Sequence, residues 1–461
     1  MNNTTTAAPA ALVAAPPPVW KVFLMFLGPM MLSNILQSLS GTINSVYLGH
    51  MIGVQALAAA SAFFPMMLFL ISFIMGLGSG ASVLVGQAWG AKLPERVQAV
   101  AGTTITCSLL TGCFVAILGA IFAPEILSVL ATPADILGPA TTYARVMLLA
   151  MPSLFVFLIV VSMMRGVGDM VTPLKALAVS TAVGLALTPA LIRGWLGFPP
   201  AGVASAAYAG LVSFVVTLVW LGFYLHRKGH TLAPSAALLR HMKIEPGIFR
   251  SVMRIGLPTA VQMVTMSLAE VALLSIVNGF GSAATASYGI GNQVLGYVQF
   301  PAMSIAIAAS ILGAQAIGAG HTERLGLITR TGIMLNVVIT GGLLLICYVF
   351  SRSLIGFFTS DAEVMEISQK MLYIILWSTL LFGASTVFSG VMRASGTVLP
   401  PTILSISAIL LVEVPVAFTL SGRVGIEGVW WAYPATFATM LIFQASYYRF
   451  VWRKRKITRL I

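Results

Sequence analysis

The chain has 461 residues, of which 58% are hydrophobic and only 8% are charged, and its formal net charge at pH 7 is +13. Soluble domains are about 45–50% apolar and about 25% charged, so this composition excludes a water-facing surface and predicts an integral membrane protein. The positive charge gathers on one side of the predicted membrane, and this makes nucleic-acid binding the weaker interpretation.

Residues 1–18 are mainly Ala, Pro and Thr, without a charged or apolar core, so they are expected to form a disordered leader and not a signal peptide. Twelve apolar runs of about 20 or more residues follow, and each is a predicted helical span. The predicted spans are 20–46, 55–85, 97–122, 136–164, 171–193, 201–226, 248–278, 283–312, 325–350, 364–393, 398–420 and 426–451. The fold class is therefore all-α integral membrane, with six helices in each half.

Basic residues alternate strongly between the two sides of these spans. The side that holds both termini carries 20 Lys and Arg residues, whereas the opposite side carries 5. By the positive-inside rule both termini are expected in the cytoplasm, in the inner (plasma) membrane of a bacterium. The predicted organisation is an N-lobe at 19–226, a cytoplasmic linker at 227–247, a C-lobe at 248–451 and a basic tail at 452–461.

An internal repeat relates the two halves. The segment Gly86-Gln87-Ala88-Trp89-Gly90-Ala91 returns as Ala314-Gln315-Ala316-Ile317-Gly318-Ala319, an offset of 228 residues (315 − 87). Met164-Arg165 recurs as Met392-Arg393 at the same offset. Since each half has an even number of spans, both enter from the same side, and an axis along the membrane normal relates them. Such duplication predicts a site between two lobes that rock against each other.

Several chemistries are not supported by the sequence. It lacks a Gly-x-x-x-x-Gly-Lys-Ser/Thr phosphate loop, so ATP hydrolysis within this chain is not expected. The five His and three Cys residues show no metal-ligand spacing, and neither a metal site nor a catalytic residue is predicted. An embedded enzyme would place several polar groups at one depth, and that pattern is missing.

Two acidic residues lie well within predicted spans, Glu270 in span seven and Glu413 in span eleven. An ionised carboxylate at mid-bilayer costs at least about 2.5–3.5 kcal/mol, so such groups usually face inward and serve function. Glu413 precedes Pro415, which cannot donate a backbone hydrogen bond and frees a carbonyl nearby. Both are candidates for a coupling or substrate-binding carboxylate, and the alternative for each is a protonated acid hydrogen-bonded between helices.

Amide side chains are weaker candidates, because bonds between helices explain most of them. Asn34, Gln37 and Asn44 have spacings of 3 and 7 residues and lie on one face of span one. Asn292 belongs to a polar group in spans seven and eight.

The chain resembles the multidrug and toxic compound extrusion (MATE) family, within the multidrug/oligosaccharidyl-lipid/polysaccharide exporter superfamily. The resemblance covers about 20–450 and rests on the twelve spans, the repeat and the order of several motifs. These are Leu27-Gly28-Pro29, echoed by Gly256-Leu257-Pro258, then Gly-Gln-Ala-Trp-Gly-Ala after span two, Met-Arg-Gly-Val-Gly-Asp after span four and Phe300-Pro301-Ala302-Met303-Ser304-Ile305. It implies a V-shaped pair of six-helix bundles that exports organic cations and amphipathic drugs in exchange for protons or sodium.

The resemblance also assigns positions. Glu270 matches an acidic residue that many bacterial members carry in span seven, and Asn292 matches an asparagine of the sodium-coupled branch. The aspartate that many members have late in span one falls on Asn44, which cannot titrate, so coupling is expected in the C-lobe. Protons are slightly favoured over sodium, because a hard cation wants several oxygen ligands at once.

The expected partners are small organic cations and membrane lipids, and the expected working unit is a monomer without a cofactor. The apolar body of a cation is expected to pack on Met263, Phe300 and Phe382. Two other classes stay open. A flippase for lipids or lipid-linked oligosaccharides would need Arg or Lys near mid-bilayer, which the sequence does not show, and a membrane-embedded enzyme would need the missing polar cluster.

Overall fold

The computed structural model describes residues 17–130, 132–195 and 202–461, and every regular element in this part of the chain is helical. The predicted leader at 1–18 lies almost wholly outside the described residues. The first half contains the helices α1 (Val19–Met51), α2 (Val54–Ala62), α3 (Phe64–Gly90), α4 (Pro94–Ile121), α5 (Ala123–Val129), α6 (Ala134–Leu149), α7 (Met151–Val167), α8 (Val171–Arg193), the 3₁₀ turn η2 (Gly202–Ala204) and α9 (Ser205–Arg227).

The short helix α10 (Ala236–Arg240) lies in the predicted linker. The second half contains α11 (Pro246–Asn278), α12 (Ser282–Ala319), α13 (Arg324–Leu335), η3 (Asn336–Thr340), α14 (Gly341–Val349), α15 (Ser351–Gly356), α16 (Ala362–Ile375), η4 (Leu376–Ser378), α17 (Thr379–Ala394), α18 (Leu399–Ala408), η5 (Ile409–Glu413), α19 (Val414–Val424), α20 (Glu427–Phe450) and η6 (Trp452–Lys454).

Within the described residues, ten helical segments are long and apolar enough to cross a membrane, and an eleventh is the pair α6 and α7, bent by 47°. Each overlaps one predicted span. The remaining predicted span, 426–451, corresponds to α20, which has 24 residues but is less apolar. At a rise of about 1.5 Å per residue its length of about 36 Å suffices to span a bilayer.

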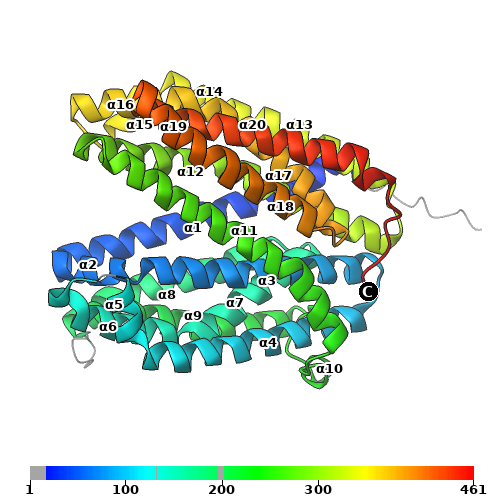
Figure 1. Ribbon diagram of the computed structural model, residues 1–461. Helices are drawn as coiled ribbons and strands as arrows, with labels where there is room; N and C mark the ends of the chain where they lie inside the picture. Colours follow the sequence, from blue (N-terminus) through cyan, green and yellow to red (C-terminus); the bar gives the residue numbers. More distant parts are fainter. Residues whose placement is uncertain (1–16, 131, 196–201) are drawn as a thin grey trace, which may run out of the picture.

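The helices form two groups that diverge from one end of the molecule (Figure 1). Helices α2 to α9 make one group and α12 to α20 the other, while α1 and α11 run between them. Helix α11 packs on α3 of the first group, and α1 packs on α12 and α13 of the second as well as on α8. The first helix of each half therefore also contacts the other half.

The repeated motif joins the two groups at the end that carries the C-terminus. The Gln87 amide donates to the carbonyl of Ala394 at 2.7 Å, and the Gln315 amide donates to the carbonyl of Gly166 at 2.9 Å. Gln87 and Gln315 are repeat counterparts, as are Gly166 and Ala394, so the two bonds are related by the pseudo-symmetry.

Glycine is required where these two segments cross. A Cβ atom at Gly90 would lie 2.1 Å from the carbonyl oxygen of Gln315, and one at Gly318 would lie 1.9 Å from that of Gln87. Such contacts are sterically impossible without movement of the backbone. The conspicuous sequence repeat therefore forms the tight contact between the lobes.

Candidate functional site

Glu270 lies on α11, eight residues before the helix ends, and its carboxylate receives three hydrogen bonds. The hydroxyls of Tyr288 and Tyr433 donate to Oε2 at 2.6 and 2.9 Å, and the amide of Asn292 donates to the same oxygen at 3.3 Å. The two hydroxyl oxygens lie 3.0 Å apart. Donors directed at one oxygen stabilise an ionised carboxylate in an apolar bundle.

Three helices supply this cluster. Tyr288 and Asn292 stand four residues apart on one face of α12, while Tyr433 comes from α20. Both tyrosines are buried, whereas Glu270 is partly exposed. The Oδ1 atom of Asn292 is buried and has no hydrogen-bond partner among the described residues. One acceptor is thus available next to the carboxylate.

Glu413 ends the π-helical turn η5, and its side chain is 6% exposed. This turn packs on α11, which carries Glu270, and on α20, which carries Tyr433. The π-helical turn stands directly before the segment with Pro415, where the regular backbone ladder is interrupted. The structure therefore brings the two intramembrane carboxylates of the sequence into one region of the C-lobe.

Aromatic side chains form the packing around the tyrosines. The ring of Trp430 stacks on Tyr288, with centroids 5.8 Å apart. The ring centroid of Phe437 lies 6.0 Å from that of Tyr433 and 5.0 Å from that of Phe382. Phe382 is therefore connected to Tyr433 of the carboxylate cluster through the ring of Phe437.

Among the described residues, the other predicted site residues have no hydrogen bond or ring contact with this cluster. Asn34 on α1 donates to Ser304 on α12 at 3.5 Å, and Asn44 accepts a bond from Thr188 at 3.1 Å. Gln37 is exposed on α1. Met263 is half-buried on α11, and Phe300 packs against Tyr297. Among the described residues, no hydrogen bond or ring contact joins Gln37, Met263 or Phe300 to Glu270.

Sequence reasoning missed Tyr288, Trp430 and Tyr433. In an apolar run an aromatic residue is read as part of the hydrophobic core, and the polar hydroxyl is ignored. A usable signal was present, because Tyr288 and Asn292 share a helical face and Trp430 and Tyr433 stand one turn apart.

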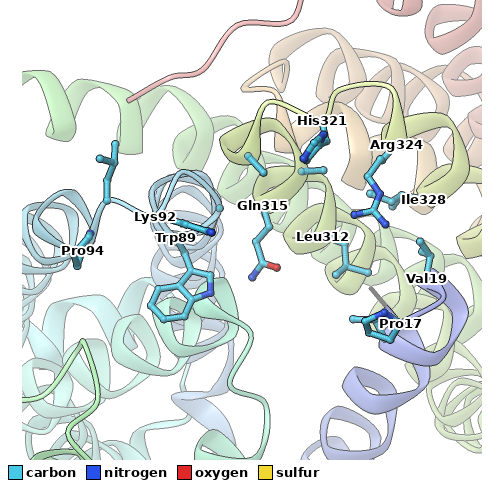
Figure 2. Close-up of a pocket in the computed structure, with 15 residues that line it drawn as sticks. Pro17, Val19, Trp89, Lys92, Pro94, Leu312, Gln315, His321, Arg324 and Ile328 are labelled. Carbon is cyan, nitrogen blue, oxygen red and sulfur yellow. The ribbon is translucent and has the colours of Figure 1, made fainter. Parts of the chain in front are cut away.

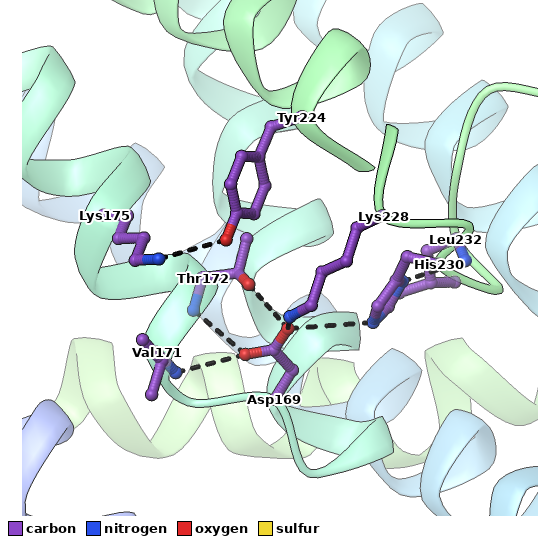
Figure 3. Close-up of polar contacts among 8 residues, drawn as sticks. All are labelled: Asp169, Val171, Thr172, Lys175, Tyr224, Lys228, His230 and Leu232. Carbon is purple, nitrogen blue, oxygen red and sulfur yellow. Dashed lines mark hydrogen bonds and ion pairs between the residues drawn. The ribbon is translucent and has the colours of Figure 1, made fainter. Parts of the chain in front are cut away.

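A second polar cluster lies at the turn between α7 and α8 (Figure 3). Asp169 accepts bonds from the backbone amides of Val171 and Thr172 at 3.2 and 2.9 Å, and from the Thr172 hydroxyl at 2.6 Å. It also forms an ion pair with Lys228 at 3.2 Å, and His230 lies 3.8 Å away. This cluster fixes the start of the predicted linker onto the first half of the chain.

The electrostatics of this cluster are set by burial and by its partners. Burial acts to raise the pKa of Asp169, but the bonds from Thr172 and the charge of Lys228 outweigh it and hold that pKa below the usual range. Burial also lowers the pKa of His230, against the opposing effect of Asp169. Within the described residues, no group of three or more His, Cys, Asp or Glu residues could hold a metal ion.

Comparison with protein families gives one match in each half of the chain. The family named MatE matches residues 29–190 and 258–419. "Probable multidrug resistance protein YoeA" of Bacillus subtilis is 45% identical over 445 residues, which cover 96% of each chain. "Multidrug export protein MepA" of Staphylococcus saprophyticus is 27% identical and covers 90% of each chain.

Solved structures agree in fold. A structure described as "Outward-facing conformation of a multidrug resistance MATE family transporter of the MOP superfamily" superposes with a TM-score of 0.86 at 23% identity, over 94% of this chain and 95% of the other. A variant of the Vibrio cholerae MATE transporter VcmN gives a TM-score of 0.87 at 18% identity, over 95% of this chain and 98% of the other.

Proposed function

The chain belongs to the MatE family of membrane transporters, and on this premise we propose that it exports organic cations in exchange for protons, with Glu270 as the coupling carboxylate. Family membership separates it from the membrane-embedded enzymes. The observation that carries the proposal is the set of three hydrogen bonds that Tyr288, Tyr433 and Asn292 donate to Glu270 inside the C-lobe.

Glu270 has the properties that a coupling group needs. Ionised, it is held by three donors and attracts a lipophilic cation. Protonated, it loses that attraction, and its new O–H can donate to Asn292 Oδ1, the buried acceptor without a partner among the described residues. The same side chains therefore accommodate both protonation states of Glu270.

Glu413 is proposed as the second carboxylate of the site. The turn that carries Glu413 packs on α11, so a negative charge on Glu413 would add to the attraction that Glu270 exerts on a cation. The proposed cation lies near these acids, with Phe382 and the aromatic rings around Tyr433 as its apolar support.

The lobes are proposed to rock about their shared contact. Both termini are proposed to face the cytoplasm of a bacterial cell, by the positive-inside rule. The arrangement with Gln87 and Gln315 bonded across the lobes is then the one closed toward the cytoplasm. Opening that end would allow a cation to reach Glu270 from inside, and closing it again would direct the cation outward.

Transport in liposomes tests the proposal. Purified protein is reconstituted, and ethidium efflux is measured under a pH gradient alone and then under a sodium gradient alone. We expect the pH gradient to suffice, Glu270→Gln to abolish efflux and Glu413→Gln to reduce it. Glu427→Gln is the matched control, because Glu427 lies at the exposed start of α20 and outside the cluster.

Two results would contradict the proposal. Efflux that follows the sodium gradient and ignores the pH gradient would assign the oxygen-rich cluster to Na⁺, a cation that prefers several oxygen ligands. Efflux by Glu270→Gln at the rate of Glu427→Gln would remove Glu270 from the mechanism altogether.

A further inference from the structure

A cavity of about 640 Å³ opens between the lobes at the end that carries the C-terminus. Its walls come from the start of α1, the end of α3 and the turn from α12 to α13, so neither lobe forms it alone (Figure 2). The volume falls within the range of about 300–1,000 Å³ that is typical of small-molecule sites. None of the residues of the Glu270 cluster lines it.

The cavity combines an apolar wall with basic groups at its edge. Val22, Leu312 and Ile328 belong to the apolar wall. Figure 2 shows Lys92 on the α3 side and Arg324 across from it on the α13 side. Among the described residues, neither of these two cations forms an ion pair.

Glu95 and Glu323 flank this edge, but both are exposed and neither lines the cavity. Glu323 is exposed and pairs with His321 at 3.1 Å. Residues 1–16, which precede the cavity-lining Pro17 in the chain, contain no Asp or Glu. Among the described residues, the cavity lining thus carries Lys92 and Arg324 and no carboxylate, which favours an anion with an apolar body over a cation.

The backbone at Lys92 supplies an independent observation. With φ of 57°, Lys92 is the one non-glycine residue with positive φ in the described part of the chain. Its repeat counterpart, 228 positions later, is Gly320, whose φ is 84°. The same left-handed turn is thus made by glycine in one half and by lysine in the other. Strained positions of this kind cluster at ligand sites, and this one carries its ammonium at the cavity.

We propose that this cavity binds an anionic phospholipid of the adjacent leaflet, with Lys92 and Arg324 on the phosphate and an acyl chain along the apolar wall. Trp89, 42% exposed at the same edge, is a residue typical of the membrane–water interface, where a phosphate group lies. Because the two cations belong to different lobes, the site exists only while the lobes meet at this end. A bound lipid would stabilise that contact.

Lipid binding to the full-length protein tests this inference without any transport measurement. Protein in a neutral detergent is titrated with dioleoyl phosphatidylglycerol or with dioleoyl phosphatidylethanolamine, and bound lipids are counted by native mass spectrometry. We expect saturable binding of phosphatidylglycerol in preference to phosphatidylethanolamine. Each basic residue near a membrane surface contributes about 1 kcal/mol, so Lys92→Gly and Arg324→Gln should each weaken this binding about fivefold.

The variants are matched. Lys92→Gly installs the residue that the other half already uses in this turn, so it is not expected to lower the unfolding temperature. Arg96 is the repeat counterpart of Arg324 but does not line the cavity. Arg96→Gln therefore removes the same charge outside the cavity, and this variant should bind phosphatidylglycerol like wild type.

Equal lipid binding by wild type, Lys92→Gly and Arg324→Gln would overturn the inference, as would an equal loss in Arg96→Gln. A third arm uses inorganic phosphate. If millimolar phosphate alone displaces phosphatidylglycerol completely, the phosphate contact carries the binding and the proposed site for the acyl chain is wrong.

Discussion

Tyr288 and Tyr433 place two hydroxyl groups on one carboxylate oxygen of Glu270, and this makes the tyrosines testable as positioning residues. A hydrogen bond to a charged group contributes about 1.5–3 kcal/mol, which corresponds to about 10- to 150-fold. We expect Tyr433→Phe to reduce proton-driven ethidium efflux within that range, because the ionised carboxylate loses a donor. The measurement is the initial efflux rate in liposomes at several pH values.

Tyr448→Phe is a close control for this change. Tyr448 also lies on α20 and is buried, but its hydroxyl pairs with Thr329 at 3.0 Å and not with Glu270. Its loss should lower stability and leave the efflux rate per folded molecule unchanged. Equal efflux by Tyr433→Phe and Tyr448→Phe would show that Tyr433 serves packing alone.

The same residues show which parts of the site could be predicted from the sequence. Glu270 and Asn292 could be predicted, because a polar group in an apolar run is costly and therefore conspicuous. Tyr433 was missed, since a tyrosine satisfies both an apolar environment and a polar partner, and its spacing from Trp430 was the one signal that marked it. The contact of Glu270 with α20 joins residues 163 positions apart, and spacing along one helix carries no information about it.

Among the helices, α8 has a start at which Asp169 accepts bonds from the amides of Val171 and Thr172 and also faces Lys228. Removing such a cap costs about 1 kcal/mol, and a half-exposed ion pair contributes at most about the same. We expect Asp169→Ala to lower the free energy of unfolding by about 1–2 kcal/mol, and Asp169→Asn, which keeps an acceptor, by less.

The pH dependence of this effect has a definite sign. The pKa of Asp169 is lowered in the folded state, so its stabilisation is complete above the ordinary aspartate value of about 3.9 and is lost as the pH falls through the folded-state pKa. Thermal unfolding in detergent should therefore separate wild type from Asp169→Ala at pH 7 and bring them together in strong acid. The exposed Asp135 offers the control Asp135→Asn, and a gap that persists in acid would refute the charge-based explanation.

The boundaries of the helices were predicted well where the pattern of apolar side chains determines them. The expected span 171–193 coincides with α8, whereas the span at 136–164 is bent by 47° between α6 and α7. The π-helical turns at 336–340 and 409–413 were not predicted. A hydropathy profile sums the side chains and does not detect a change in backbone hydrogen bonding. Such a change forms the π-helical turn that carries Glu413.

The molecule as a whole consists of two lobes, and the two copies of the repeated motif cross each other where the lobes meet. The family and the V-shaped fold expected from the sequence are confirmed by the comparisons. The reason for the motif became visible only in three dimensions, because Gln87 and Gln315 each bind a carbonyl of the opposite lobe. The backbone amide of Leu460 in the basic tail also donates to Gln87 Oε1 at 2.8 Å, so the tail closes over this contact.

The crossing should control which end of the molecule is open. Each neutral hydrogen bond contributes about 1 kcal/mol, so Gln87→Ala combined with Gln315→Ala should shift the equilibrium away from this closed contact by about 30-fold. Glu95 and Glu323 are exposed repeat counterparts on opposite lobes, and each can carry a spin label once the three native cysteines are replaced by serine. Double electron–electron resonance then measures the distance between the two labels. We expect a longer distance to gain population.

Gln444→Ala is the control. It removes a comparable buried bond within one lobe, from Gln444 to the Pro401 carbonyl, and should leave the distances unchanged. If the double variant keeps the wild-type distance distribution, steric fit at the crossing and not hydrogen bonding holds the lobes together.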